Sequence, residues 1–165
     1  MATAPELATA REVTIRTMLE PDVSTVVAIE RAAYQFPWSE GIFRDCLRVG
    51  YVCRVACAGD EVVGYGVMSV GAGEAHILNL CVNAHFRCRG VGKQLLKYLV
   101  ERARAAGMGE AFLEVRPSNT AAIRLYQSMG FEQVGIRRGY YQAVGGREDA
   151  AVLKLALTNR PFRAG

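Results

Sequence analysis

The sequence has few features that would point to a disulfide framework or a metal site. It has 165 residues and five cysteines, an odd number with no Cys-x-x-Cys pair. Neither a disulfide framework nor a zinc site is expected from that pattern. The two histidines, His76 and His85, have no partner at metal-ligand spacing, so we expect no metal.

Long apolar runs and a strong excess of charge are also missing. No run approaches the roughly 20 residues of a membrane span. The first residues, MATAPELATAREV, lack the basic and apolar segments of a secretion signal. We therefore expect a cytoplasmic protein without membrane contact. The net charge is +4 and the basic residues form no continuous run, so direct RNA binding is not expected and a small polyanion suits the balance better.

The length and composition fit one folded domain. A chain of 165 residues can bury a full core without a second domain. Hydrophobic residues make up 51% and charged residues 22%, as is usual for soluble globular proteins. We expect a flexible N-terminal segment over residues 1–12, a single domain over residues 13–158 and a flexible tail over residues 159–165.

Apolar residues recur with strand and helix periods in alternation along the chain. Turn residues such as Gly59, Asp60, Gly107 and Gly130 separate the segments. The predicted strands are 13–17, 51–58, 61–70, 75–82, 111–115, 131–141 and 148–157, and the predicted helices are 21–33, 39–48, 91–106 and 120–129. Hairpins and β-α-β crossovers both occur, which predicts an α/β (α+β) fold with a mixed sheet and helices on its faces.

The segment FRCRGVGKQLL, from Phe86 to Leu96, has the composition of an anion site. The first N–H groups of a helix have no acceptor within the helix, and the helix dipole adds partial positive charge there. The two glycines leave this backbone accessible, and the neighbouring basic side chains can add charged contacts. A glycine-rich turn with solvated basic residues is the alternative that the segment alone leaves open.

Two common phosphate motifs do not match this segment. A nucleoside-triphosphatase loop needs a glycine where Arg87 stands and a Ser or Thr where Gln94 stands. The dinucleotide fingerprint needs a third glycine at the position of Leu95. The sequence therefore predicts neither a kinase nor a dehydrogenase.

The order Arg87-x-x-Gly90-x-Gly92, after the strand HILNLCV, resembles the acetyl-CoA pyrophosphate loop of the GNAT N-acetyltransferase superfamily. The stretches FPWSE, LEVRPSNTAAIRLYQSMGF, RRGYY and GREDA extend the likeness over Thr14 to Leu157. Together they resemble the bacterial ribosomal-protein-alanine N-acetyltransferases, which modify the N-terminal alanine of the eighteenth small-subunit ribosomal protein. The resemblance implies a GNAT fold with about seven strands and four helices, and acetyl-CoA as co-substrate.

The same resemblance assigns residues to coenzyme A. The pantetheine arm would pair with the exposed backbone of a splayed strand at Leu80, Cys81 and Val82, and Asn119 would add a polar contact. The residues implied for the pyrophosphate are Arg87, Cys88, Arg89, Gly90, Val91, Gly92 and Lys93. Cys88 stands where a polar or basic residue is common in the family, so its backbone N–H is expected to contribute more than its side chain.

Acyl transfer to an amine needs a neutral amine and a proton for the departing thiolate. An N-terminal amine with a pKa of ~7.7–8.0 meets the first condition more readily than lysine at ~10.4. The resemblance implies Glu114 as general base and Tyr126, twelve residues later, as general acid and cofactor contact. The pattern alone also allows an exposed strand carboxylate near Arg116 and a core tyrosine. We expect direct transfer, with an acyl group carried on Cys81 or Cys88 as the rival.

The resemblance also implies that FPWSE and RRGYYQAVGGRED line the groove for a ribosomal protein N-terminus. From the residues alone, a packed aromatic turn and a solvated hairpin explain them equally well. A basic N-terminus would need local acids in a basic enzyme, and Glu40, Glu148 and Asp149 are the candidates. The alternatives are a GNAT enzyme with broader N-terminal or small-amine substrates, and a non-catalytic acetyl-CoA sensor. The presence of both Glu114 and Tyr126 argues against the sensor.

Overall fold

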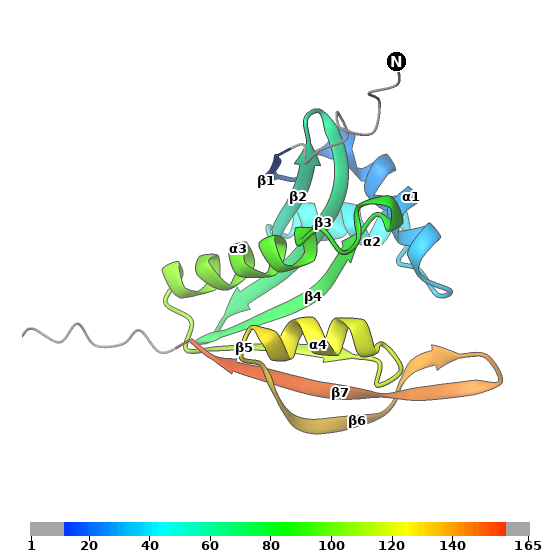
Figure 1. Ribbon diagram of the computed structural model, residues 1–165. Helices are drawn as coiled ribbons and strands as arrows, with labels where there is room; N and C mark the ends of the chain where they lie inside the picture. The colour runs from blue at the N-terminus through cyan, green and yellow to red at the C-terminus, as the bar shows by residue number, and fades with distance from the viewer. Residues whose placement is uncertain (1–11, 158–165) are drawn as a thin grey trace, which may run out of the picture.

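A computed structural model describes residues 12–157 of the chain (Figure 1). Apart from Glu12, the two segments expected to be flexible lie outside the described residues, as does residue 158. The strands are β1 (Val13–Thr17), β2 (Val52–Ala58), β3 (Glu61–Gly71), β4 (Glu74–Val82), β5 (Glu110–Val115), β6 (Glu132–Ala143) and β7 (Gly146–Ala156). The helices are α1 (Val23–Ala33), α2 (Glu40–Arg48), α3 (Val91–Ala105) and α4 (Thr120–Ser128), with short 3₁₀ turns at Glu20–Asp22 and Ala84–Phe86. Every predicted element is present in the predicted order.

The strands form one seven-stranded sheet in the order β1-β2-β3-β4-β5-β7-β6. Neighbouring strands are antiparallel, except for the parallel pair β4 and β5 in the middle. Parallel neighbours need a crossover, and α3 supplies it between β4 and β5 (Figure 1). The predicted mixed sheet with helices on its faces is confirmed.

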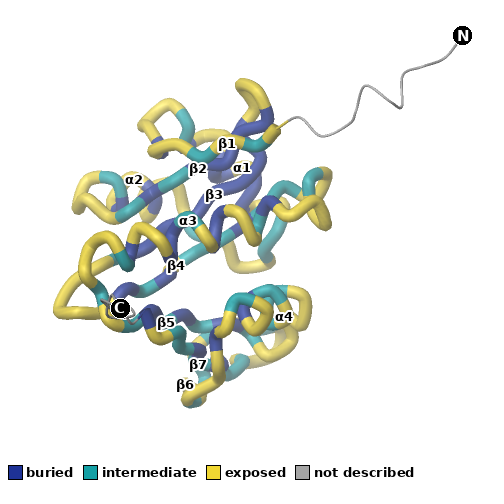
Figure 2. Tube along the Cα trace, turned by 60° about the vertical axis from the view of Figure 1, so that its left-hand side comes forward, coloured by how far each residue is buried: buried dark blue, intermediate teal, exposed yellow. Residues whose placement is uncertain are grey.

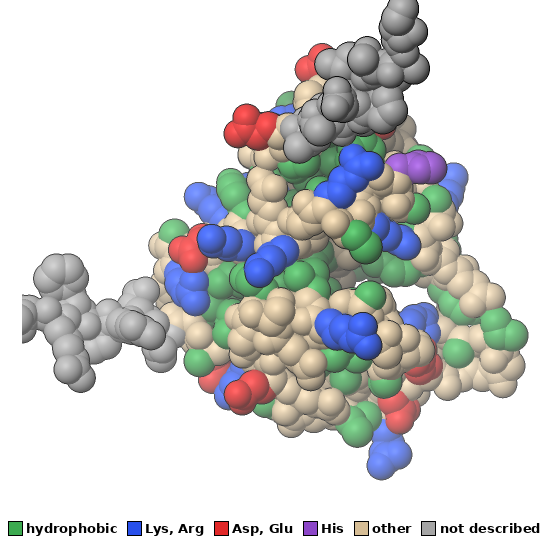
Figure 3. All heavy atoms as spheres, in the orientation of Figure 1, with side chains coloured by type: hydrophobic (Ala, Val, Ile, Leu, Met, Phe, Trp, Pro, Cys, Tyr) green, Lys and Arg blue, Asp and Glu red, His purple; other side chains and the backbone are tan. Residues whose placement is uncertain are grey.

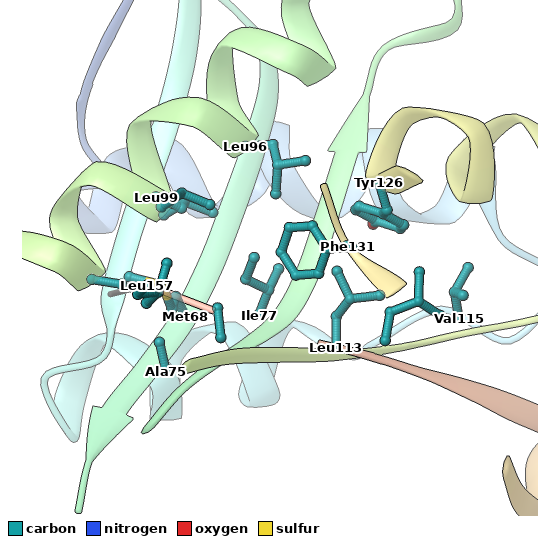
Figure 4. Close-up of a cluster of buried hydrophobic side chains, with 14 of the residues drawn as sticks. Met68, Ala75, Ile77, Leu96, Leu99, Leu113, Val115, Tyr126, Phe131 and Leu157 are labelled. Atoms are coloured by element: carbon teal, nitrogen blue, oxygen red, sulfur yellow. The ribbon is translucent and has the colours of Figure 1, made fainter. Parts of the chain in front are cut away.

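The helices cover the sheet in two groups. Buried residues of α1 and α2 pack with β2, β3 and Cys81 of β4 in one cluster. Those of α3 and α4 pack on the other face with Ile77 of β4, Leu113 of β5 and Phe131 (Figure 4). Figure 2 shows the buried residues concentrated along the central strands between these helices. None of the described helices is long and apolar enough to cross a membrane.

The helix ends follow the residues that the sequence offers. The Ser39 hydroxyl accepts a hydrogen bond from the Ile42 N–H at the start of α2 (3.3 Å), and the Asn119 side chain does the same for Ala122 in α4 (3.2 Å). Each such cap stabilises a helix by about 1 kcal/mol. Gly107 and Gly130 follow α3 and α4 with φ of 80° and 96°, which suits glycine.

The parallel pair β4 and β5 separates partway along. The two strands pair only from Glu74↔Glu110 to Ile77↔Leu113, whereas β4 stays paired with β3 as far as Val82. Leu78 is an extra residue in the β3–β4 register, because Met68 pairs with Ile77 and Val67 with Asn79. From Leu78 onward, one edge of β4 therefore has no strand beside it, and β4 and β5 diverge in Figure 1.

Close packing of α3 on β3 gives a stability prediction at Gly66. A Cβ at this position would lie 2.8 Å from Leu99 Cδ1 and 3.3 Å from Leu80 Cδ1. We expect Gly66→Ala to lower the free energy of unfolding by about 1–3 kcal/mol, because both leucines lie in packed surroundings. The matched control is Gly71→Ala at the end of β3, where no atom lies within 4 Å of the new Cβ. Urea unfolding checks this, and equal midpoints for the two variants would contradict it.

Candidate active site

A cavity of about 590 Å³ opens where β4 and β5 separate. Its walls come from β4 and β5, the segment between α1 and α2, the start of α4, and the β6–β7 hairpin. The surface is hollowed between α3 and α4, with Lys and Arg side chains on both sides of the hollow (Figure 3). The polar residues that line the cavity are Glu30, Tyr34, Gln35, Asn79, Glu114, Arg116, Ser118, Asn119, Tyr126, Tyr141, Gln142 and Glu148.

Glu114 projects from β5 toward this cavity. Its side chain is only 9% exposed and contacts two basic groups. His76 Nε2 lies 3.1 Å from both carboxylate oxygens, and Arg137 Nη1 donates to Oε1 at 3.2 Å. Glu114 is therefore not the exposed carboxylate beside Arg116 that the pattern allowed, and Arg116 instead pairs with Glu148 at 3.1 Å. The two basic contacts hold the Glu114 carboxylate in one orientation at the cavity wall.

Tyr126 reaches the cavity from the other face of the sheet. It is 8% exposed, and its ring packs edge-on against Phe131 with centroids 5.9 Å apart (Figure 4). Burial raises the pKa of its phenol to about 12, so the group keeps its proton at neutral pH. No buried polar side-chain atom of residues 12–157 lacks a partner. The Tyr126 hydroxyl forms no hydrogen bond with any of these residues, so its oxygen cannot be one of the buried atoms. It must therefore be accessible from the cavity that Tyr126 lines.

The free edge of β4 presents backbone carbonyls to the gap. The Tyr34 hydroxyl donates to the Leu80 carbonyl at 3.2 Å, and Arg87 Nε donates to the Val82 carbonyl at 3.4 Å. These two carbonyls thus point away from β3, as expected for a strand that can pair with an extended ligand. The Cys81 side chain lies on the α1 face, and burial raises the pKa of its thiol. A protonated, buried thiol is a poor nucleophile.

The start of α3 offers free backbone donors just beyond the cavity. The Gln94 N–H bonds to the Gly90 carbonyl, so the N–H groups of Val91, Gly92 and Lys93 have no acceptor in the helix. Gly90 has a φ of 78°, a left-handed conformation that glycine adopts without strain. This helix start has the donor geometry that an anion such as a pyrophosphate needs.

The side chains around this helix start are exposed and basic. Arg87, Arg89 and Lys93 are all exposed, and the Arg89 guanidinium lies over the Phe86 ring at 5.2 Å. Cys88 is also exposed and has a φ of 61°, although it is not glycine. The residues predicted for coenzyme A therefore divide into two neighbouring groups. Leu80, Asn119 and Tyr126 line the cavity, whereas Cys81, Val82 and residues 87–93 do not.

Both segments predicted for the substrate side lie at the cavity. Phe36 and Trp38 line it from the segment between α1 and α2, and Tyr141, Gln142, Ala143, Val144 and Glu148 line it from the hairpin. Of the three acidic residues predicted for this side, only Glu148 lines the cavity. Glu40 pairs with Arg44 (2.8 Å) and Asp149 accepts from the Gly139 N–H (2.8 Å), and neither lines the cavity. Glu148 lines it, and hydrogen bonds from Ser118 and Arg116 hold the pKa of Glu148 below its usual value.

Several residues at the site were not predicted from the sequence. They are Glu30, Tyr34 and His76, which contact Glu114 or the β4 edge or line the cavity. Arg137, the other contact of Glu114, belongs to the RRGYY stretch that the resemblance places at the groove. The lining includes three acidic residues, Glu30, Glu114 and Glu148, and one basic residue, Arg116. Arg137 pairs with Glu114 from outside the lining, so acidic groups still outnumber arginines here although the chain is basic. Among residues 12–157, no three His, Cys, Asp or Glu side chains cluster as metal ligands would.

Comparisons with known proteins agree with this architecture. The model of the acetyltransferase (GNAT) family matches residues 15–131. The [ribosomal protein bS18]-alanine N-acetyltransferase of Salmonella typhimurium is 36% identical over 145 residues, which cover 88% of this chain and 98% of that protein. The crystal structure of the Escherichia coli ribosomal-protein-S18-alanine N-acetyltransferase superposes with a TM-score of 0.84 at 32% identity, covering 93% and 99% of the two chains. Ard1 from Thermoplasma volcanium matches with a TM-score of 0.81 at 27% identity over 88% and 98%. The chain belongs to the GNAT family of acetyltransferases.

Proposed function

We propose that this protein transfers an acetyl group from acetyl-CoA to the N-terminal alanine of ribosomal protein bS18. The names of its relatives in Salmonella typhimurium and Escherichia coli support this acceptor. The observation that carries the proposal is that Glu114, Tyr126 and the open edge of β4 share one cavity. A carboxylate can accept the proton that the amine loses, and a protonated phenol can supply the proton that the departing thiolate needs. The unpaired strand edge can hold an extended ligand beside them.

The residues around the β4–α3 junction suit acetyl-CoA, which the GNAT family uses. Bound there, it would supply an activated acetyl thioester. The carbonyls of Leu80 and Val82 lie on the unpaired edge of β4, and each already accepts one hydrogen bond, from Tyr34 or Arg87. A carbonyl oxygen has a second lone pair, which can accept from an extended arm. The free N–H groups of Val91, Gly92 and Lys93 can bind the pyrophosphate, with Arg87 and Arg89 adding charge.

Glu114 and Tyr126 take opposite roles in proton transfer. As the amine nitrogen bonds to the acetyl carbon, Glu114 accepts the proton that the nitrogen loses, directly or through water. As the bond between that carbon and sulfur breaks, the Tyr126 hydroxyl gives its proton to the departing sulfur. Solvent then removes the proton from Glu114 and restores the one on Tyr126. The raised phenol pKa of about 12 keeps Tyr126 able to donate across the pH range in which the amine becomes neutral.

The acidic lining suits a positively charged peptide N-terminus. Glu30, Glu114 and Glu148 face the cavity, and only two arginines oppose them, Arg116 at Glu148 and Arg137 at Glu114. A low-dielectric cleft concentrates such a field, so a basic peptide can enter although the chain carries +4.

The acceptor is tested with three substrates. We expect acetyl-CoA and a peptide that begins with the bS18 alanine to give N-terminally acetylated product in mass spectrometry. The same peptide with a blocked N-terminus and an internal lysine should react at least 100-fold more slowly, since lysine is far less often neutral at pH 7. A polyamine that reacts as fast as the alanine peptide would contradict the proposal, and so would tight coenzyme A binding without any turnover.

The two proposed catalytic groups can be tested with matched controls. We expect Glu114→Gln to lower kcat by about 10²–10⁴-fold, and Tyr126→Phe to lower it by a similar order while keeping the ring packed on Phe131. The control for Glu114 is Glu110→Gln, on the same face of β5 but paired with Lys154 outside the cavity. The control for Tyr126 is Tyr98→Phe on α3.

The pH profile adds a second measurement for Tyr126. For the wild type, kcat/KM should rise as the amine loses its proton and should stay level up to about pH 10, because the Tyr126 pKa is raised to about 12. Full activity of either cavity variant, or a fall in the wild-type profile between pH 8 and about pH 9, would contradict the assigned roles.

Direct transfer predicts that no cysteine carries the acetyl group. We expect Cys88→Ala to keep kcat within about twofold, since this side chain is exposed. Cys81→Ala should also turn over, with lower stability because it removes a buried group beside Tyr65. Mass spectrometry of the enzyme with acetyl-CoA alone should find no added acetyl mass. An acetylated cysteine that disappears when peptide is added would instead establish an acyl-enzyme route.

A further inference from the structure

Glu30 is the one charged residue in the buried core of residues 12–157, and the proposed proton transfers do not use it. It lies near the end of α1, is 2% exposed, and lines the cavity. Three donors converge on its carboxylate. The Tyr65 hydroxyl of β3 and Asn79 Nδ2 of β4 (2.9 Å) donate to Oε1, and the backbone N–H of Trp38 donates to Oε2 (2.8 Å). One side chain thus connects a helix, two strands and a loop.

All three donors are uncharged. Within the described part of the chain, no Lys, Arg or His forms an ion pair with Glu30. A buried carboxylate without a cation depends on such hydrogen bonds, and its donors in turn depend on it. Removing the Glu30 side chain would leave the Trp38 N–H and the Asn79 amide without these acceptors. The Glu30 carboxylate therefore holds α1, β3, β4 and the Trp38 segment together.

Trp38 is the part of this arrangement that faces the substrate cavity. It follows the Tyr34–Pro37 segment and, with Phe36, forms the cavity wall between α1 and α2. Its ring packs on Phe43 of α2 with centroids 5.3 Å apart, and Phe43 packs edge-on against Tyr65 at 5.5 Å. The ring is thus fixed through Phe43, and the backbone through Glu30. Tyr65 takes part in both connections.

We propose that Glu30 is a positioning residue that fixes the Phe36–Trp38 wall and so makes the cavity selective for a small first side chain. This inference rests on the proposed function, because the wall lies on the side of the cavity where the acceptor would bind. A rigid wall excludes larger side chains by their size, whereas a loosened wall accepts them at the expense of affinity for alanine. Glu30 acts through Trp38 and Asn79 and takes no part in the proton transfers.

We call the hydrogen bond from the Trp38 N–H to Glu30 the tether. It can be tested without any substrate, because Trp38 is the only tryptophan in the chain and so reports on this wall alone. We expect Glu30→Ala to shift the fluorescence of Trp38 to longer wavelength and to increase its quenching by acrylamide. The matched control is Val26→Ala, one turn earlier on α1, which removes a fully buried side chain that does not line the cavity. It should lower stability while leaving Trp38 fluorescence as in the wild type. Identical fluorescence for the wild type and Glu30→Ala at a temperature where both are folded would overturn the tether.

Kinetics then test what the tether does for selectivity. We expect Glu30→Ala to raise KM for the alanine peptide by about tenfold, as the loss of a buried hydrogen bond predicts, and to leave KM for acetyl-CoA within about twofold. The preference for alanine over leucine as first residue should fall by a similar factor. Glu30→Gln should restore most of the selectivity, because a glutamine oxygen can still accept from the Trp38 N–H while its amide bonds to Tyr65 and a rotated Asn79.

The outcomes separate this inference from the proposed function. A wild type that acetylates no peptide would refute the proposed function, while the fluorescence test of the tether would stand. Equal increases of both KM values in Glu30→Ala, or the same loss of selectivity in Val26→Ala, would show a general loss of structure and overturn the positioning role. A Glu30→Gln variant as unselective as Glu30→Ala would mean that the charge matters, which also overturns it.

Discussion

The site exists because the pairing between β4 and β5 stops partway along the two strands. The β4 and β5 strands pair up to Ile77 and Leu113 and no further, while each stays paired with its other neighbour. An unpaired strand edge in the middle of a sheet leaves backbone groups that need a partner. Here the Tyr34 hydroxyl and the Arg87 guanidinium cover two of the carbonyls, at Leu80 and Val82. The gap is a place in an otherwise continuous sheet where an extended ligand can bind as a strand would.

The same gap explains how two groups from opposite faces of the sheet meet. Leu113 and Val115 pack among α3 and α4, so the alternation of β5 turns Glu114 to the α1 face. Tyr126 belongs to the α3 and α4 cluster and lies on the other face. A continuous sheet would separate these side chains. They line one cavity because no strand pairing closes the sheet between Leu78 and Val82.

The sequence was sufficient to predict the helices and strands, because their signals lie in residues that are close together along the chain. Local signals such as the apolar periods and the turn residues Gly107 and Gly130 predicted the elements that the structure contains. The contacts of His76 could not be predicted in this way. His76 and Glu114 meet only through the parallel register that pairs His76 with Phe112.

The extra residue at Leu78 is a second reason why part of the site could not be predicted from the sequence. It shifts the alternation of β4, so that His76 and Asn79 serve the same face although three positions separate them. A period of two places these residues on opposite faces. Non-local register and a bulge, rather than residue type, decided these positions, and no pattern in the chain signals either of them.

The open edge of β4 lies beside one basic and one acidic region, which the net charge of the chain does not reveal. Beyond the end of the strand, Arg87, Arg89 and Lys93 surround the free donors of α3, which favours an anion. Beside its middle, the cavity lining is acidic, which favours a cation. The total of +4 averages two regions of opposite sign. An anionic cofactor and a cationic peptide would each be attracted to a different part of the same edge, so their charges help to set which end of the gap each enters. In the proposed function, that order would bring the amine, rather than a phosphate, to the carboxylate of Glu114.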